Sequence, residues 1–172
     1  IGMCREERME NPLSQEVRLE EITEADVSVL ADIMKRAFDD DTRMHTSLEE
    51  DGPSGYADGS LLRRLKEKEN CTTGKILWHG EIIGGFAVST DGDVCTLELL
   101  FIDPDRKSHG IGTDAWKAIR RKFPEARRWY VETPDYSTRN HRFYTEKCGF
   151  RFLKKQSYGE GAAAVFVLDI EK

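Results

Sequence analysis

The sequence predicts a single domain of the α/β (α+β) class, built on a mixed, mostly antiparallel and twisted sheet of about seven strands with about four helices. The length of 172 residues suits one domain. Segments that alternate apolar and polar residues, as strands do, are interspersed with segments whose apolar residues recur at helical spacing. The turn signals His79-Gly80 and Asp91-Gly92 separate neighbouring strands, which is typical of antiparallel hairpins.

The first half of the chain predicts one strand and two helices. Residues 16–22 alternate as a strand, and Thr23 follows as the N-cap of a helix. The apolar residues of this helix recur at helical spacing: Val27, Leu30, Ile33, Met34 and Phe38. Residues 39–59 have few apolar side chains and predict a loop or a broken helix. Ser60 is placed to cap a second helix that runs to about residue 70.

The second half predicts six strands and two helices. The strands are expected at residues 74–79, 81–89, 94–102, 128–133, 150–155 and 163–170. A helix after Gly110 carries apolar residues on one face and ends before Pro124. A short helix over residues 138–148 ends at Gly149, which suits the left-handed closing position.

Composition excludes several classes of protein. The formal net charge of −6 argues against a nucleic-acid partner, which would favour a basic excess. No apolar run approaches the ~18 residues that a membrane span needs. The first 15 residues predict a polar tail without a signal core, ahead of a domain over residues 16–172, so a cytoplasmic protein is expected. The four cysteines show no metal-ligand spacing, and neither a metal site nor a disulfide is expected.

A glycine-rich turn, Lys107-Ser-His-Gly-Ile-Gly112, opens the helix that follows strand 94–102. Such a turn presents unpaired backbone N–H groups beside the positive end of the helix dipole. Together they make a site for phosphate. A dinucleotide fold would need a third glycine within a parallel βαβ unit, and a phosphate loop would need Gly-Lys-Ser/Thr; the chain has neither.

A second cluster, Asn140-His-Arg-Phe-Tyr144, lies on the expected helix 138–148. Asn140 and Tyr144 are four residues apart and therefore share one helix face. An amide and a phenol that face the same way can order a ligand and deliver a proton. The alternative is that Phe143 and Tyr144 simply pack in the core, and the spacing alone leaves both interpretations open.

The two clusters together resemble the GNAT superfamily of acyl-CoA-dependent N-acyltransferases. That family shows an apolar strand, Pro, and Arg/Gln-x-x-Gly-x-Gly/Ala opening a helix, followed later by Asn and Phe-Tyr-x-x-x-Gly-Phe. The matching residues here are Pro104, Lys107, Gly110, Gly112, Asn140, Phe143, Tyr144, Gly149 and Phe150. Lys107 replaces the usual Arg or Gln and keeps a donor. The resemblance covers about residues 17–157, and segments such as Gly52-Pro-Ser-Gly-Tyr56 are similar to a bacterial subgroup whose substrate is unsettled.

The resemblance implies acetyl-CoA as co-substrate and a role for each matched position. The pyrophosphate would be held at the helix start, by Lys107, Ser108, His109, Gly110, Ile111 and Gly112, with Thr113 beside them. Phe101 and Ile102 would pair their main chain with the pantetheine arm where strands splay apart. Asn140 would hydrogen-bond that arm or an ordered water, and Tyr144 would protonate the departing thiolate.

Acetyl transfer also needs a base, because an alkyl amine has a pKa near ~10.4 and arrives protonated. Glu98 lies on the strand that leads to the cofactor turn, and Glu132 lies on the next strand. We favour Glu98 because it is closer in sequence to the turn. The alternative is that Glu98 is an ordinary surface glutamate.

The net charge of the chain is concentrated in residues 39–59. Seven acidic residues there oppose only Arg43, a balance of −6: Asp39, Asp40, Asp41, Glu49, Glu50, Asp51 and Asp58. In the GNAT resemblance this region borders the acceptor site, where a negative field would attract a cationic amine. The alternative is a solvated, mobile loop.

The sequence therefore predicts a GNAT acetyltransferase that moves an acetyl group from acetyl-CoA to a cationic primary amine in a ternary complex. The rival interpretation is a non-catalytic CoA-binding or regulatory module on the same scaffold, because fold does not fix function. A small-molecule amine and a peptide amine both remain open as the acceptor, as do a monomer and a homodimer.

Overall fold

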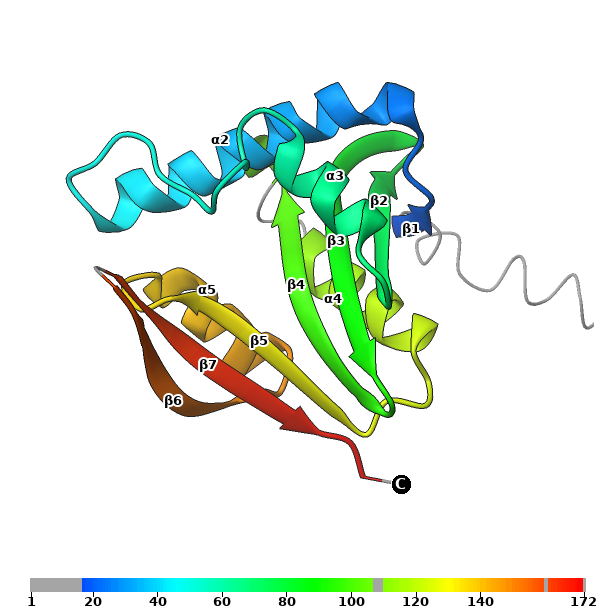
Figure 1. Ribbon diagram of the computed structural model, residues 1–172, viewed down its shortest axis with the longest axis vertical. Coiled ribbons are helices and arrows are strands. Elements are labelled where there is room, and N and C mark those ends of the chain that lie inside the picture. The colour runs from blue at the N-terminus through cyan, green and yellow to red at the C-terminus, as the bar shows by residue number, and fades with distance from the viewer. Residues whose placement is uncertain (1–16, 107–109, 160, 172) are drawn as a thin grey trace, which may run out of the picture.

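The computed structural model describes residues 17–106, 110–159 and 161–171 (Figure 1). The predictions for the N-terminal tail and for Lys107, Ser108 and His109 lie outside these residues. No helix in this part of the chain is long and apolar enough to cross a membrane.

A seven-stranded sheet in the order β1-β2-β3-β4-β5-β7-β6 forms the centre of the molecule. Its strands are β1 (Val17–Glu20), β2 (Cys71–Trp78), β3 (Glu81–Asp91), β4 (Val94–Ile102), β5 (Arg128–Pro134), β6 (Arg151–Tyr158) and β7 (Gly161–Asp169). All neighbouring strands pair antiparallel except β4 and β5, which are parallel. The predicted mixed, mostly antiparallel sheet is confirmed.

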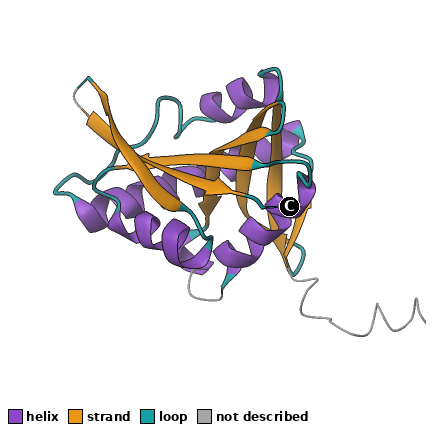
Figure 2. Ribbon diagram, turned by 90° about the horizontal axis from the view of Figure 1, so that it is seen from below, coloured by secondary structure: helices purple, strands orange, loops and turns teal. Residues whose placement is uncertain are grey.

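Helices cover both faces of the sheet (Figure 2). They are η2 (Glu24–Asp26), α2 (Val27–His45), α3 (Ser60–Glu67), η3 (Pro104–Arg106), α4 (Ile111–Lys122), α5 (Thr138–Arg142) and the π turn η4 (Phe143–Lys147). On one face, α2 and α3 bury Leu30, Met34 and Leu62 against the sheet. On the other face, α4 buries Trp116 and Ile119 in a second core cluster.

Strands β4 and β5 diverge after a short stretch of pairing (Figure 1). The pairing joins Val94–Leu97 to Arg128–Val131 only. A β-bulge follows on β4, because Leu97 and Leu99 oppose adjacent residues of β3 and leave Glu98 between them. From Leu99 onward, the edge of β4 that faces β5 therefore has main-chain groups without a strand partner.

The structure corrects three details of the sequence analysis. Residues 39–45 continue helix α2 without a break, whereas a loop or a broken helix was expected, because Asp39 and Asp41 are buried with polar partners. Gly59, at a φ of 88°, is the N-cap of α3, and Ser60 is its first residue.

The third correction concerns the helix expected over residues 138–148, which is divided into α5 and the π turn η4. Four residues separate Tyr144 from Gly149, one more than in the pattern Phe-Tyr-x-x-x-Gly-Phe. A π turn accommodates one extra residue within a helix and is frequent at functional sites.

Candidate functional site

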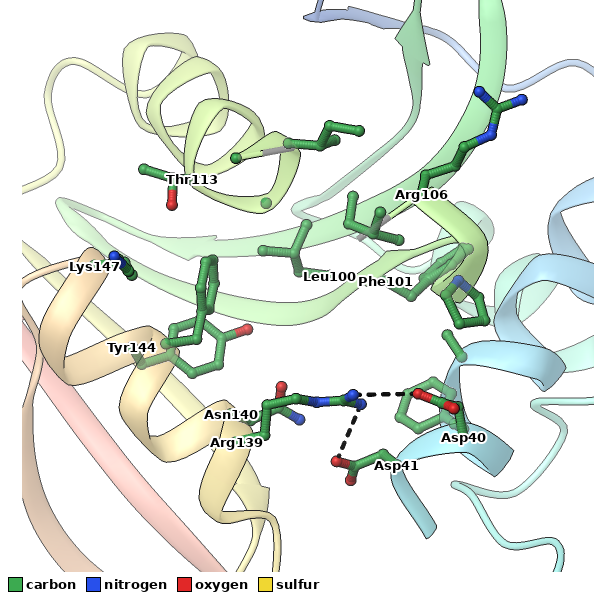
Figure 3. Close-up of a pocket in the computed structure, with 18 of the residues that line it drawn as sticks. Asp40, Asp41, Leu100, Phe101, Arg106, Thr113, Arg139, Asn140, Tyr144 and Lys147 are labelled. Atoms are coloured by element: carbon green, nitrogen blue, oxygen red, sulfur yellow. Dashed lines mark hydrogen bonds and ion pairs between the residues drawn. The ribbon is translucent and has the colours of Figure 1, made fainter. Parts of the chain in front are cut away.

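A cavity of about 300 Å³ opens where β4 and β5 diverge (Figure 3). Six segments line it: α2, the end of β4, η3, the first turn of α4, the end of β5, and α5 with η4. Of the predicted site residues, the cavity brings together Phe101, Ile102, Gly110, Ile111, Gly112, Thr113, Asn140 and Tyr144. The two sequence clusters thus meet in one place.

The first turn of α4 forms one end of the cavity. Gly110 is the N-cap of this helix at a φ of 72°, a conformation that glycine adopts without strain. A Cβ added at Gly110 would meet no atom within 4 Å among the described residues other than its chain neighbours, so none of these fills the space beside the helix start. The first N–H groups of a helix have no partner within it, and here they lie at the positive end of the dipole. This end of the cavity fits a phosphate group.

Gly112 lets the two motifs pack closely. A Cβ at Gly112 would lie 3.2 Å from the ring of Phe143, tighter than ordinary contact. The second glycine of the helix start therefore has a packing role, since it brings η4 against α4. The same contact positions the neighbouring Tyr144 over the cavity.

The open edge of β4 forms one wall of the cavity. Leu100, Phe101 and Ile102 line it, on the segment that has lost its pairing with β5. Such an edge offers main-chain donors and acceptors at strand spacing to an extended ligand. The geometry fits the pairing with a pantetheine arm that the resemblance implies.

Tyr144 packs in the core and also lines the cavity. Its ring packs against Phe143 and Phe150, with centroids 5.0 and 5.6 Å away, and the residue is only 6% exposed. Its hydroxyl nevertheless points into the cavity (Figure 3). No hydrogen bond joins this hydroxyl to any described residue. Burial, with a smaller contribution from Cys148, raises the pKa of Tyr144 well above its usual range, so the phenol keeps its proton at neutral pH.

A charged cluster lies at the end of the cavity away from α4. Arg139 extends from α5 towards α2, and its guanidinium lies 3.2 Å from Asp40 Oδ2 and 3.6 Å from Asp41 Oδ1 (Figure 3). The buried Asp41 also accepts a hydrogen bond of 2.9 Å from Ser137 Oγ. These contacts join segments almost a hundred residues apart. Sequence reasoning missed Arg139 and assigned the aspartates to a loop.

Two further cationic residues, Lys147 and Arg106, line the cavity, and sequence reasoning missed Lys147. Lys147, the last residue of η4, faces the cavity near the start of α4 (Figure 3). Arg106 lies beyond β4, where it bonds to Glu81 and stacks over Trp78 at 5.8 Å. The position of Lys147 as a basic residue within the Phe-Tyr segment was the signal that could have identified it.

Neither carboxylate considered as the base lines the cavity. Glu98, in the β-bulge, forms an ion pair with Lys68 at 3.3 Å. Glu132 accepts a hydrogen bond of 2.8 Å from the hydroxyl of Tyr158. A base role for either residue would therefore need water molecules to carry the proton. Among the described residues, no group of three or more His, Cys, Asp or Glu side chains gathers to hold a metal ion.

Residues outside the acidic segment offset part of its charge. Asp39 forms an ion pair with Lys35 at 2.5 Å and accepts a hydrogen bond from the Tyr56 hydroxyl at 2.7 Å. Burial opposes ionisation, but these donors outweigh it and lower the pKa of Asp39. Arg139 offsets one of the next two aspartates. The interpretation of residues 39–41 as a solvated loop is therefore wrong.

Comparison with known proteins agrees with this geometry. Residues 31–150, more than half of the chain, match the acetyltransferase (GNAT) family. The chain belongs to this family. Its match includes both the glycine-rich and the Phe-Tyr segments, so the resemblance drawn from the motifs is confirmed.

Two solved acetyltransferase structures share the fold of this chain at low sequence identity, and one curated protein matches part of its sequence. An acetyltransferase from Thermus thermophilus superposes with a TM-score of 0.69 at 19% identity, covering 91% of this chain and 99% of that one. The aminoglycoside acetyltransferase AAC(6')-Ib, solved with ribostamycin and coenzyme A, has a TM-score of 0.68 at 22% identity, covering 90% and 94%. The uncharacterized protein YrkN of Bacillus subtilis (strain 168) is 37% identical over 81 residues, which span 46% of this chain and 44% of YrkN.

Proposed function

We propose that this protein transfers the acetyl group of acetyl-CoA directly to a primary amine. The observation that carries the proposal is the cavity itself. It joins an open helix start, an unpaired strand edge and a buried phenol whose hydroxyl faces the space between them. The complex of AAC(6')-Ib with coenzyme A and ribostamycin supports the same interpretation by likeness of fold.

Each part of the cavity has a binding role in this proposal. The backbone amides at Gly110, Ile111 and Gly112 bind the pyrophosphate, with Thr113 beside them. The edge of β4 at Phe101 and Ile102 binds the pantetheine arm, and Asn140 hydrogen-bonds it or an ordered water. Acetyl-CoA supplies the acetyl group activated as a thioester.

The chain's own residues then handle the protons. The amine nitrogen forms the new C–N bond as the C–S bond breaks, and Tyr144 gives its proton to the sulfur. The amine loses its proton, which restores the phenol. Because none of the described cysteines lines the cavity and burial raises the pKa of Cys148 to about 12, a covalent acetyl-cysteine step is disfavoured.

The test has two readouts. Calorimetry measures acetyl-CoA binding, and thiol release measures turnover with a panel of primary alkyl amines. Binding with amine-dependent thiol release supports the proposal. Binding without release from any amine favours the non-catalytic module, and the absence of binding refutes both.

A further inference from the structure

The apolar part of α2 that lines the cavity takes no part in the proposed binding of acetyl-CoA. Ala37 and Phe38 line the cavity about one helical turn before Asp41, which lies at the end of the cavity away from α4 (Figure 3). In the proposed function, the first turn of α4 and the edge of β4 bind the pyrophosphate and the pantetheine arm. The wall formed by α2 is therefore available to the acceptor.

The ring of Tyr56 packs against Phe38. The two ring centroids are 5.9 Å apart and the ring planes meet at 82°, an edge-to-face arrangement that aromatic pairs prefer. Phe38 lines the cavity, whereas Tyr56 does not. The ring of Tyr56 can therefore influence a ligand in the cavity through the position that it gives to Phe38.

The segment Gly52-Pro-Ser-Gly-Tyr56 fixes the ring of Tyr56 in place. A Cβ added at Gly52 would lie 2.7 Å from this ring, so a larger residue there would displace it. The hydroxyl of Tyr56 donates a hydrogen bond of 2.7 Å to Oδ1 of Asp39, which is buried. One contact restrains the ring and the other restrains the hydroxyl, so the segment holds an aromatic side chain against Phe38.

We infer that Phe38 is a specificity-determining residue that contacts the carbon chain of the acceptor, and that Tyr56 is its positioning residue. The inference rests on the proposed function and names the acceptor class as a primary amine whose amino group is attached to an apolar chain. Ala37 and Pro134 add apolar surface to the same cavity. Removing methylene groups from water favours binding. Because Tyr56 holds the ring of Phe38 before the acceptor arrives, little side-chain entropy is lost on binding.

A homologous series of amines measures this contact. Ethylamine, butylamine and hexylamine have the same reacting group and differ only in their number of methylene groups. For the unmodified protein, kcat/KM should rise by about two- to fourfold per methylene group, the effect of burying half or all of it. The increase from ethylamine to hexylamine should therefore be at least about tenfold.

Substitutions at Phe38 test whether its ring makes the contact. Phe38→Ala should reduce the increase to within about threefold, while the Kd for acetyl-CoA changes less than about twofold. Phe38→Leu keeps an apolar side chain and should keep most of the increase. Phe152→Ala is the matched control and should keep all of it. This substitution removes an exposed ring that makes a similar edge contact, 5.8 Å from Phe166, outside the cavity.

Substitutions at Tyr56 test its positioning role. Tyr56→Ala should reduce the increase by raising KM for hexylamine, with much less change in kcat, a split that a general loss of stability would not produce. Because Tyr56 acts through Phe38, the double variant Phe38→Ala/Tyr56→Ala should show the same chain-length dependence as Phe38→Ala alone. Tyr56→Leu, which keeps apolar volume, replaces Tyr56→Ala if that variant fails to fold.

The outcomes are distinct. An unmodified protein that binds acetyl-CoA and acetylates the three amines equally well overturns the inference while leaving acetyl transfer intact. An increase that survives Phe38→Ala also overturns it, and so does a Kd for acetyl-CoA that changes more than about twofold in that variant, because the ring would then belong to the cofactor site. An increase that survives both substitutions at Tyr56 overturns the positioning role. An unmodified protein that acetylates none of the amines overturns the proposed function as well.

Discussion

Replacing Gly110 by Asp tests the phosphate end of the cavity. Gly110 is the N-cap of α4, and a Cβ added there would meet no described residue other than its chain neighbours within 4 Å. A carboxylate there would occupy the position where a phosphate must approach. We expect the Kd for acetyl-CoA to rise sharply while the fold is kept.

The magnitude follows from the charges. Two unit charges about 5 Å apart interact by about 3 kcal/mol at the effective dielectric typical of sites near a protein surface. A factor of ten in Kd corresponds to about 1.4 kcal/mol, so repulsion between the carboxylate and one phosphate charge predicts about a hundredfold weaker binding. The positive φ of 72° adds a stability cost of about 1 kcal/mol for a residue with a Cβ. That cost lowers Tm by about 2–4 °C in a protein of this size.

Two controls separate charge from strain. Gly110→Asn introduces the same backbone strain and nearly the same volume without the charge. Gly92→Asp introduces the charge at another open glycine of positive φ, 62°, in the turn between β3 and β4 and outside the cavity lining. Calorimetric titration with acetyl-CoA gives Kd, and a thermal melt gives Tm. If Gly110→Asp binds acetyl-CoA as Gly110→Asn does, α4 does not hold the phosphate and the reasoning fails.

Three other substitutions test the remaining parts of the molecule. Tyr144→Phe should lower kcat by about 10²–10⁴-fold with little change in acetyl-CoA affinity, whereas a kcat within about threefold of the parent would make the phenol structural. Glu98→Gln should leave the shape of the pH–rate profile unchanged because Glu98 pairs with Lys68 outside the cavity; a selective loss at low pH would identify it as the base. Asp39→Asn should destabilise the fold by about 2 kcal/mol at pH 7. Because the pKa of Asp39 is lowered in the fold, its contribution begins to fall below the unfolded-state pKa of about 4 and is lost as pH drops through the lower folded pKa, so melts of parent and variant should converge below that folded pKa.

Local patterns in the sequence were sufficient to predict most strands of the sheet. The hairpins between β2, β3 and β4 followed from alternating residues and from Gly80 and Gly92 at positive φ. The C-terminal end of α2 could not be predicted from such local patterns. Asp39 and Asp41 are polar, which favoured a loop or a broken helix for its last turns. Each is buried because a distant side chain donates a hydrogen bond to it, and the local sequence does not show which donor that will be.

The parts of the site that are formed by a single short segment could be predicted from the sequence. The open helix start at Gly110 and the helix face shared by Asn140 and Tyr144 depend on neighbours a few residues away. The divergence of β4 from β5 is different, since it depends on where a parallel pairing between distant strands stops. Glu98 was favoured as the base from its distance along the chain to the turn, but the bulge and Lys68 determine where its carboxylate lies.

The acidic segment shows why charge must be counted in space before it is given a function. Along the chain, residues 39–59 hold a balance of −6, equal to the net charge of the protein. In the fold, Lys35 binds both Asp39 and Glu50, and Arg139 reaches Asp40 and Asp41 from the other side of the cavity. Asp40 and Asp41, the part of this charge that lines the cavity, are thus both engaged by Arg139. Carboxylates engaged in ion pairs in this way give less long-range steering of a cationic acceptor than the count along the chain suggests.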